Sequence, residues 1–196
     1  MLEPDWNQER PSFSEISLFW KGDVFTNISY SNADIENVII ELEKSHVNGG
    51  CKIFCAEYIE HPTLHWFVSR NRFEELEFFE HYFKTESFRN NGIKFDLKKD
   101  KLEWEWLSPF ILDGDIARTL KSGGAYEAFK GSGKEAKDLG VKFYEALFGD
   151  RYEDIELFKT YEPWSNWFYD VAWDQTWVCV DKQRSLIWAI LLTDTD

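Results

Sequence analysis

The hydrophobic pattern is most pronounced near the C-terminus of the chain. Residues 175–180 (QTWVCV) are β-branched and aromatic, and Trp177 and Cys179 alternate with the residues that fall on the other face. Residues 185–192 (SLIWAILL) are apolar at successive positions, which is typical of a strand covered on both faces. A polar break of about four residues separates the two runs, and helix caps are missing. This pattern predicts a β-hairpin at the centre of a sheet.

Shorter patterns upstream predict further strands and helices. Expected strands span residues 14–20, 24–30, 51–59, 64–69, 93–97, 102–106 and 155–161. The clean alternation of residues 93–97 and 102–106 around a lysine-rich turn predicts a second hairpin. One expected helix begins after Ser31 or Asn32, and another begins after Ser132. Two further helices are expected over residues 72–85 and 113–121.

These elements predict a single α+β domain that spans residues 1–196. We expect a mainly antiparallel sheet built from hairpins in ββα-type units, with helices packed on one face and the C-terminal hairpin central in the sheet. Residues 1–12, which include Pro4 and Pro11, are expected to form an irregular lead. The glycine-rich residues 130–133 are a candidate internal linker. A chain of 196 residues suits one core better than two full domains.

Composition narrows the classes of partner. Aromatic residues make up 18% of the chain, and the formal net charge is −14. This charge disfavours nucleic acid and anionic membranes as partners and fits a basic protein, while the oligomeric state stays open. A transmembrane helix needs about 18 consecutive apolar residues, and the sequence has no such run and no signal-peptide pattern at its start. Three cysteines do not make a disulfide framework. We therefore expect a cytoplasmic location.

Two motif-like segments do not meet the requirements of the sites they suggest. Residues 131–134 (GSGK) resemble part of a phosphate-binding loop. However, Ala128 stands where the first glycine is needed, and Glu135 replaces the hydroxyl that holds Mg²⁺. Cysteines and histidines gather in a zinc-like composition at Cys51, Cys55, His61 and His65. On a strand the two cysteines would lie ~13 Å apart, too far to share one Zn²⁺. We therefore predict no metal and no cofactor.

The most distinctive polar set is acidic and precedes or follows the C-terminal strands. It comprises Asp170, Asp174, Asp181, Asp194 and Asp196. Carboxylates at strand ends can hold a divalent cation or act as a general acid and base, but they also cap turns or lie in a solvated tail. Aromatic residues crowd the same region and either fill the core or form a patch within an acidic rim. The predicted partner-binding residues are Asp170, Asp174, Trp164, Trp167 and Trp173.

Three functions follow as hypotheses, and we predict no catalytic residue. The preferred one is a non-catalytic acidic domain that binds a basic protein. Its small size, acidity and lack of a catalytic signature are similar to the broad class of bacterial immunity and inhibitor proteins. The alternatives are a hydrolase-like or metal-dependent enzyme that uses the C-terminal carboxylates, or a domain that binds an apolar small molecule in an aromatic pocket.

Overall fold

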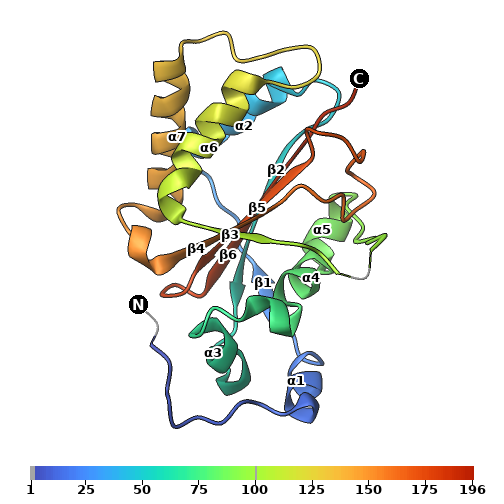
Figure 1. Cartoon of the computed structure of the whole chain (residues 1–196), viewed down its shortest axis with the longest axis vertical. Coiled ribbons are helices and arrows are strands. Elements are labelled where there is room, and N and C mark those ends of the chain that lie inside the picture. Colours follow the sequence, from blue (N-terminus) through green and yellow to red (C-terminus); the bar gives the residue numbers. More distant parts are fainter. Residues whose placement is uncertain (1–2, 100) are drawn as a thin grey trace.

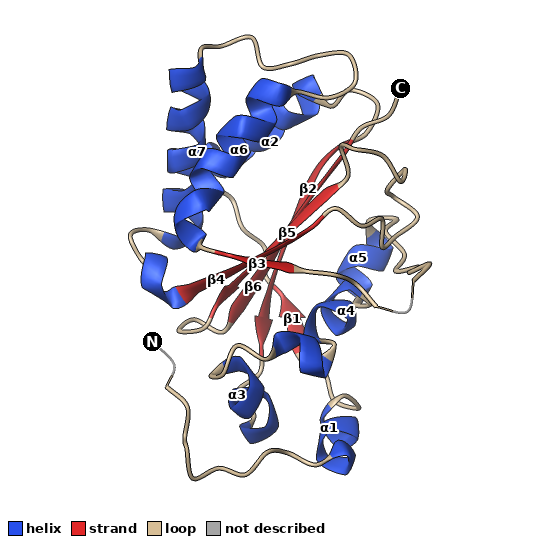
Figure 2. Cartoon of the chain, viewed as in Figure 1, coloured by secondary structure: helices blue, strands red, loops and turns tan. Residues whose placement is uncertain are grey.

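A six-stranded antiparallel sheet organises the part of the chain that the computed structural model describes, residues 3–99 and 101–196. The strands are β1 (Phe25–Asn27), β2 (Gly50–Tyr58), β3 (Glu105–Leu107), β4 (Ile155–Thr160), β5 (Gln175–Asp181) and β6 (Leu186–Thr193), in the spatial order β1-β2-β6-β5-β4-β3. Figure 2 shows these strands between two groups of helices. The α-helices are α1 (Phe13–Phe19), α2 (Ala33–Ser45), α3 (Pro62–Val68), α4 (Phe78–Phe83), α5 (Glu86–Asn90), α6 (Leu112–Ser122) and α7 (Gly133–Phe148). Short 3₁₀ segments are η1 (Phe73–Leu76), η2 (Pro109–Ile111) and η3 (Tyr152–Asp154).

The C-terminal hairpin lies at the centre of the sheet, as the hydrophobic pattern predicts. β5 pairs with β6 in a register that sets Cys179 opposite Trp188, and the outer neighbours are β4 and β2. Every residue of β5 is buried. Val178 and Val180 face one hydrophobic core, whereas Trp177 and Cys179 face the other. The predicted α+β class and the central hairpin are therefore confirmed.

Helices cover both faces of the sheet, which differs from the one-sided cover that we expected. Figure 1 shows α2, α6 and α7 on one side and α1, α3, α4 and α5 on the other. The two cores they form with the sheet are separate clusters. Strands that are apolar at every position, such as β6, expose a hydrophobic surface on each side, so each side needs a helical layer.

Two segments expected to be strands are helices. Residues 14–19 fall in α1, and Trp20 is its C-cap. The start of α1 is fixed by a capping box: the Ser12 side chain accepts from the backbone N–H of Glu15, and the Glu15 side chain accepts from the backbone N–H of Ser12. Residues 64–69 fall mostly in α3, where His61 caps the first turn and Pro62 occupies a first-turn position. In both cases the capping signal outweighs a short run of strand-forming residues.

The expected hairpin at residues 93–106 does not form between the described residues. Phe95 bridges to Ser165 instead, and β3 pairs with β4. Asp100, in the expected turn, lies outside the described residues. The expected helix at residues 72–85 is divided into η1 and α4 by Glu77, whose φ of 50° is left-handed.

Strand–helix–strand units replace the expected ββα units. The segment β1–α2–β2 and the segment β3–α6–α7–β4 each return antiparallel to a neighbouring strand. The caps of the long helices are as predicted: Asn32 begins α2, and Ser132 begins α7 in a capping box with Glu135. Residues 130–132 end the segment that connects α6 to α7, Gly133 is the first residue of α7, and the two helices pack together. Within the described residues no helix has the length and apolarity needed to cross a membrane.

Candidate functional site

A loop of residues 161–174 connects the end of β4 to the start of β5 and contains all five predicted partner-binding residues. Trp164 anchors it from inside. Its side chain has no exposed surface, its Nε1 donates to Thr176 Oγ1 at 2.9 Å, and its ring stacks on Phe83 at 4.0 Å. Trp164 therefore contributes to the core and offers no surface to a partner.

Asp174 fixes the shape of the same loop. The residue is 1% exposed, and its carboxylate accepts from the backbone N–H of Asp170 at 2.7 Å, from that of Val171 at 3.1 Å, and from the Thr193 hydroxyl. Asp170 itself is exposed and left-handed, with φ of 64°, a conformation that aspartate tolerates better than most residues. Asp174 is thus an internal cap, while Asp170 lies on the outside.

Aromatic side chains occupy the outer surface of this fixed loop. Tyr169 is 52% exposed, and Trp167 and Trp173 are half-buried. The ring of Trp167 packs edge-on against Phe168 at 5.2 Å. Of the five predicted residues, Asp170, Trp167 and Trp173 reach the surface, and Trp164 and Asp174 hold the loop in place.

The other C-terminal carboxylates do not gather into one cleft. Asp181 is the last residue of β5 and is buried. Its carboxylate accepts hydrogen bonds from Nη1 and Nη2 of Arg151 and from the backbone N–H of Arg184. Asp194 is buried after β6 and accepts from the backbone N–H groups of Asn48 at 2.9 Å and Ala125 at 2.7 Å. Asp174, Asp181 and Asp194 therefore each organise a different piece of backbone.

A buried ion pair on β4 was not anticipated from the sequence. Lys159 has a side chain only 2% exposed, and its Nζ lies 2.6 Å from a carboxylate oxygen of Asp115 in α6. Trp177 Nε1 donates to the same oxygen at 2.7 Å. Burial raises the pKa of Asp115, but the hydrogen bonds from Lys159, Trp177 and Arg118 and the charge of Lys159 together lower the pKa overall. The signal was available, because a lysine within the apolar strand IELFKT needs a counterion.

The cysteines and histidines of the zinc-like composition lie in different settings. Cys51 and Cys55 are buried thiols on β2, and burial raises the pKa of Cys55 to about 12. His61 caps α3, with its Nδ1 accepting from the backbone N–H of Thr63. Across residues 3–99 and 101–196, no group of three His, Cys, Asp or Glu side chains is arranged to hold a metal ion.

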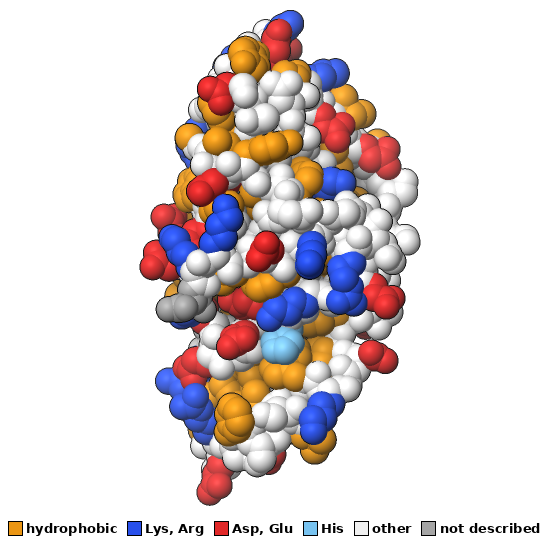
Figure 3. Space-filling view, turned by 90° about the vertical axis from the view of Figure 1, so that its right-hand side faces the viewer, with side chains coloured by type: hydrophobic (Ala, Val, Ile, Leu, Met, Phe, Trp, Pro, Cys, Tyr) orange, Lys and Arg blue, Asp and Glu red, His pale blue; other side chains and the backbone are white. Residues whose placement is uncertain are grey.

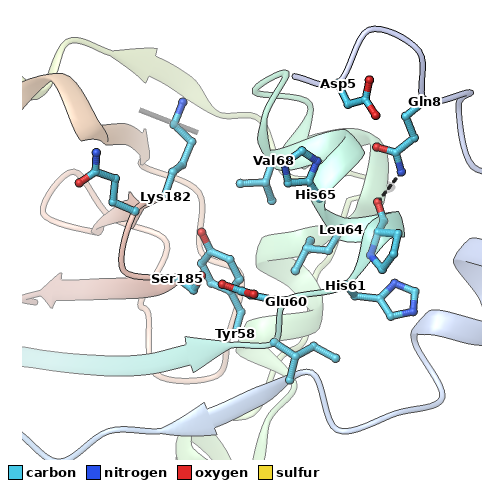
Figure 4. A pocket seen from close by; sticks show the side chains of 13 residues that line it. Asp5, Gln8, Tyr58, Glu60, His61, Leu64, His65, Val68, Lys182 and Ser185 are labelled. Atoms are coloured by element: carbon cyan, nitrogen blue, oxygen red, sulfur yellow. Dashed lines mark hydrogen bonds between the residues drawn. The ribbon is translucent and has the colours of Figure 1, made fainter. Parts of the chain in front are cut away.

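A pocket of about 790 Å³ lies at the opposite end of the hairpin from the loop (Figure 4). Four segments surround it: the N-terminal lead, the end of β2, α3 and the β5–β6 turn. The lining residues are Asp5, Gln8, Tyr58, Ile59, Glu60, His61, Pro62, Leu64, His65, Val68, Lys182, Gln183 and Ser185. Sequence patterns did not indicate this pocket, because its lining comes from segments far apart in the chain.

Comparison with known proteins gives no family for this chain. Neither a scan of protein-family models nor a search of curated proteins finds a match.

Replacing Asp174 with alanine should loosen the loop without unfolding the protein. The variant Asp174→Ala loses the acceptor for two backbone N–H groups and for Thr193, which should cost about 1–3 kcal/mol of unfolding free energy. Amide hydrogen exchange should become faster at Asp170 and Val171. The variant Asp196→Ala, at the exposed terminus, is the control. Unchanged exchange at both amides would show that Asp174 does not hold the loop.

Proposed function

We propose that the protein is a non-catalytic protein-binding domain that recognises a basic protein through the loop of residues 161–174. The observation that carries this proposal is the loop's construction: Asp174 and Trp164 fix it from inside while Trp167, Tyr169 and Trp173 remain at the surface. Aromatic side chains are enriched at protein interfaces, and a loop held in one shape loses little entropy on binding. Such a loop suits recognition without induced folding.

Charge adds attraction over a longer range than the aromatic contacts. The net charge of −14 favours a basic partner and should accelerate its encounter at low salt. The face in Figure 3, which is the right-hand side of Figure 1, carries acidic and basic side chains side by side rather than one sign alone. At the edge of the loop, Glu162 is already paired with Lys99. Specificity on this face therefore has to come mainly from the aromatic side chains.

The geometry gives less support to the alternative functions. An enzyme based on the C-terminal carboxylates needs two of them to converge, but Asp174, Asp181 and Asp194 each bind separate backbone groups. The pocket in Figure 4 contains one phenol ring, Tyr58, and two imidazoles, and so is not an aromatic cavity. An immunity- or inhibitor-type protein acting on a basic toxin in the cytoplasm is the concrete form of the proposal that best fits the acidity.

Affinity capture from the native host tests this proposal. The wild-type protein, Tyr169→Ala and Trp173→Ala serve as baits, and the captured proteins are identified by mass spectrometry. We expect a basic protein that the wild type retains, and each truncation should weaken its binding about tenfold or more, as for interface hot spots. Raising the salt concentration should also weaken it.

The control for this experiment is Phe110→Ala. Phe110 is 61% exposed and stacks on Tyr152 near the start of β4, at the opposite end of that strand from the loop. This variant should capture the partner as the wild type does. Recovery of no basic protein, or equal capture by all four baits, would contradict the proposal.

A further inference from the structure

The pocket in Figure 4 has an apolar floor and an open, polar rim. Tyr58, Leu64 and Val68 are buried and face it, and Ile59 and Pro62 extend the apolar surface. Its volume of about 790 Å³ lies within the range of small-molecule sites, and its lining combines five apolar or aromatic side chains with eight polar or charged ones. The pocket is separate from the loop, because the two ends of β5 lie ~20 Å apart at the rise of a strand.

The charges around the pocket favour a cation. Lys182 lines the pocket, but its Nζ donates hydrogen bonds to Glu156 Oε1 at 2.6 Å and to Asn71 Oδ1 at 2.9 Å. Glu60 and Asp5 also line it, and within the described residues Glu60 has no ion-pair partner. Once Lys182 is neutralised by Glu156, the lining carries an excess of carboxylate. The net charge of −14 adds to this attraction for cations.

The carboxylate of Glu60 and the apolar floor line the same pocket. Figure 4 shows Glu60 and Tyr58 reaching into the space between α3 and the β5–β6 turn. A ring such as that of Tyr58 attracts a cation to its face. An ammonium group near Glu60 would therefore have both an ion pair and a ring contact, while an attached hydrocarbon would cover Leu64 and Val68.

We propose that this pocket binds a small organic amine, an apolar group that carries one ammonium. The hydrocarbon lies on Tyr58, Leu64 and Val68, and the ammonium lies at Glu60. No covalent step is involved. This site does not depend on the protein-binding function, since none of its lining residues belongs to the loop of residues 161–174.

Calorimetric titration of the full chain tests the site. The probes are 2-phenylethylamine, tryptamine and hexylamine, with 2-phenylethanol and 3-phenylpropanoate as neutral and anionic counterparts. At least one amine should bind saturably and more tightly than both counterparts. The variant Glu60→Gln should weaken that amine about fivefold, the effect of losing a partly exposed ion pair.

The control Glu57→Gln changes an exposed carboxylate of β2 outside this lining and should leave amine binding unchanged. Unfolding midpoints confirm that each variant folds. The proposal is overturned if no amine binds, if the alcohol or the anion binds as tightly, or if Glu60→Gln has no effect. A lysine side chain also carries an ammonium, so Nα-acetyl-lysine methylamide is a further probe. Binding of that compound without binding of the free amines would overturn the small-molecule assignment.

Discussion

A chain that ends at Ala172 should not fold. The truncation removes β5 and β6, and with them the strands that pair with β4 and β2. What remains are two strand pairs that no longer form one sheet, and each helical layer loses the residues on which it packs. The expected loss is the entire folding free energy, typically 5–15 kcal/mol for a domain. The loss of folded structure should be seen as a loss of the near-ultraviolet circular dichroism signal and of amide chemical-shift dispersion in NMR spectra.

The matched control is a chain that ends at Asp194. It loses only Thr195 and Asp196, and with them one hydrogen bond from the Asn48 side chain to the Thr195 carbonyl. This shorter deletion should fold and unfold cooperatively, close to the full chain. A cooperative unfolding transition in the chain that ends at Ala172 would show that the hairpin is not the centre of the fold.

Replacing Asp115 with alanine should strongly destabilise the protein, because Asp115 is the counterion of the buried Lys159. It leaves the ammonium of Lys159 buried without its counterion, with the ring centroids of Trp177 and Tyr161 at 4.5 and 4.6 Å. An uncompensated buried charge costs about 3–5 kcal/mol. Chemical denaturation of Asp115→Ala should show that loss of unfolding free energy.

A second substitution separates the charge effect from lost packing. In Asp115→Ala/Lys159→Met, no buried charge remains at this position, so the part of the loss that is due to the charge should return. The smaller part, from the hydrogen bond that Trp177 Nε1 donates to Asp115, should not return. The variant Asp138→Ala removes a carboxylate from an exposed ion pair with Lys134 on α7 and should change stability by about 0.5 kcal/mol or less. If the double variant is as unstable as Asp115→Ala, the buried charge is not the cause.

The C-terminal hairpin was predictable because its signals are local. The apolar run of β6 requires burial on both faces, and a short polar break leaves little choice of partner for β5. The same apolar run also requires helices on both faces of the sheet, whereas the prediction placed helices on one face only. In short apolar segments such as α1 and α3, the spacing of apolar residues does not distinguish a helix from a strand. The caps at Ser12 and His61 are the features that favour a helix there.

Partners that are distant in sequence explain the remaining differences. Alternation at residues 93–106 predicted a hairpin, but Ile93 and Leu102 are buried while Trp106 is 61% exposed, and the sequence could not show that Ser165 and β4 supply the pairing. Carboxylates are usually exposed, so the burial of Asp174 and Asp181 depends on Thr193 and Arg151, whose positions only the fold reveals. Three of the five predicted site residues do reach the surface of the loop.

Amide hydrogen exchange of the full chain, measured with and without the captured basic partner, tests the central claim most directly. The claim is that an internally fixed loop binds a protein. We predict added protection within residues 161–174, greatest near Tyr169 and Asp170, and little change at the pocket lined by Glu60 and His65. Protection confined to other parts of the chain, with exchange in the loop unaltered, would contradict the claim.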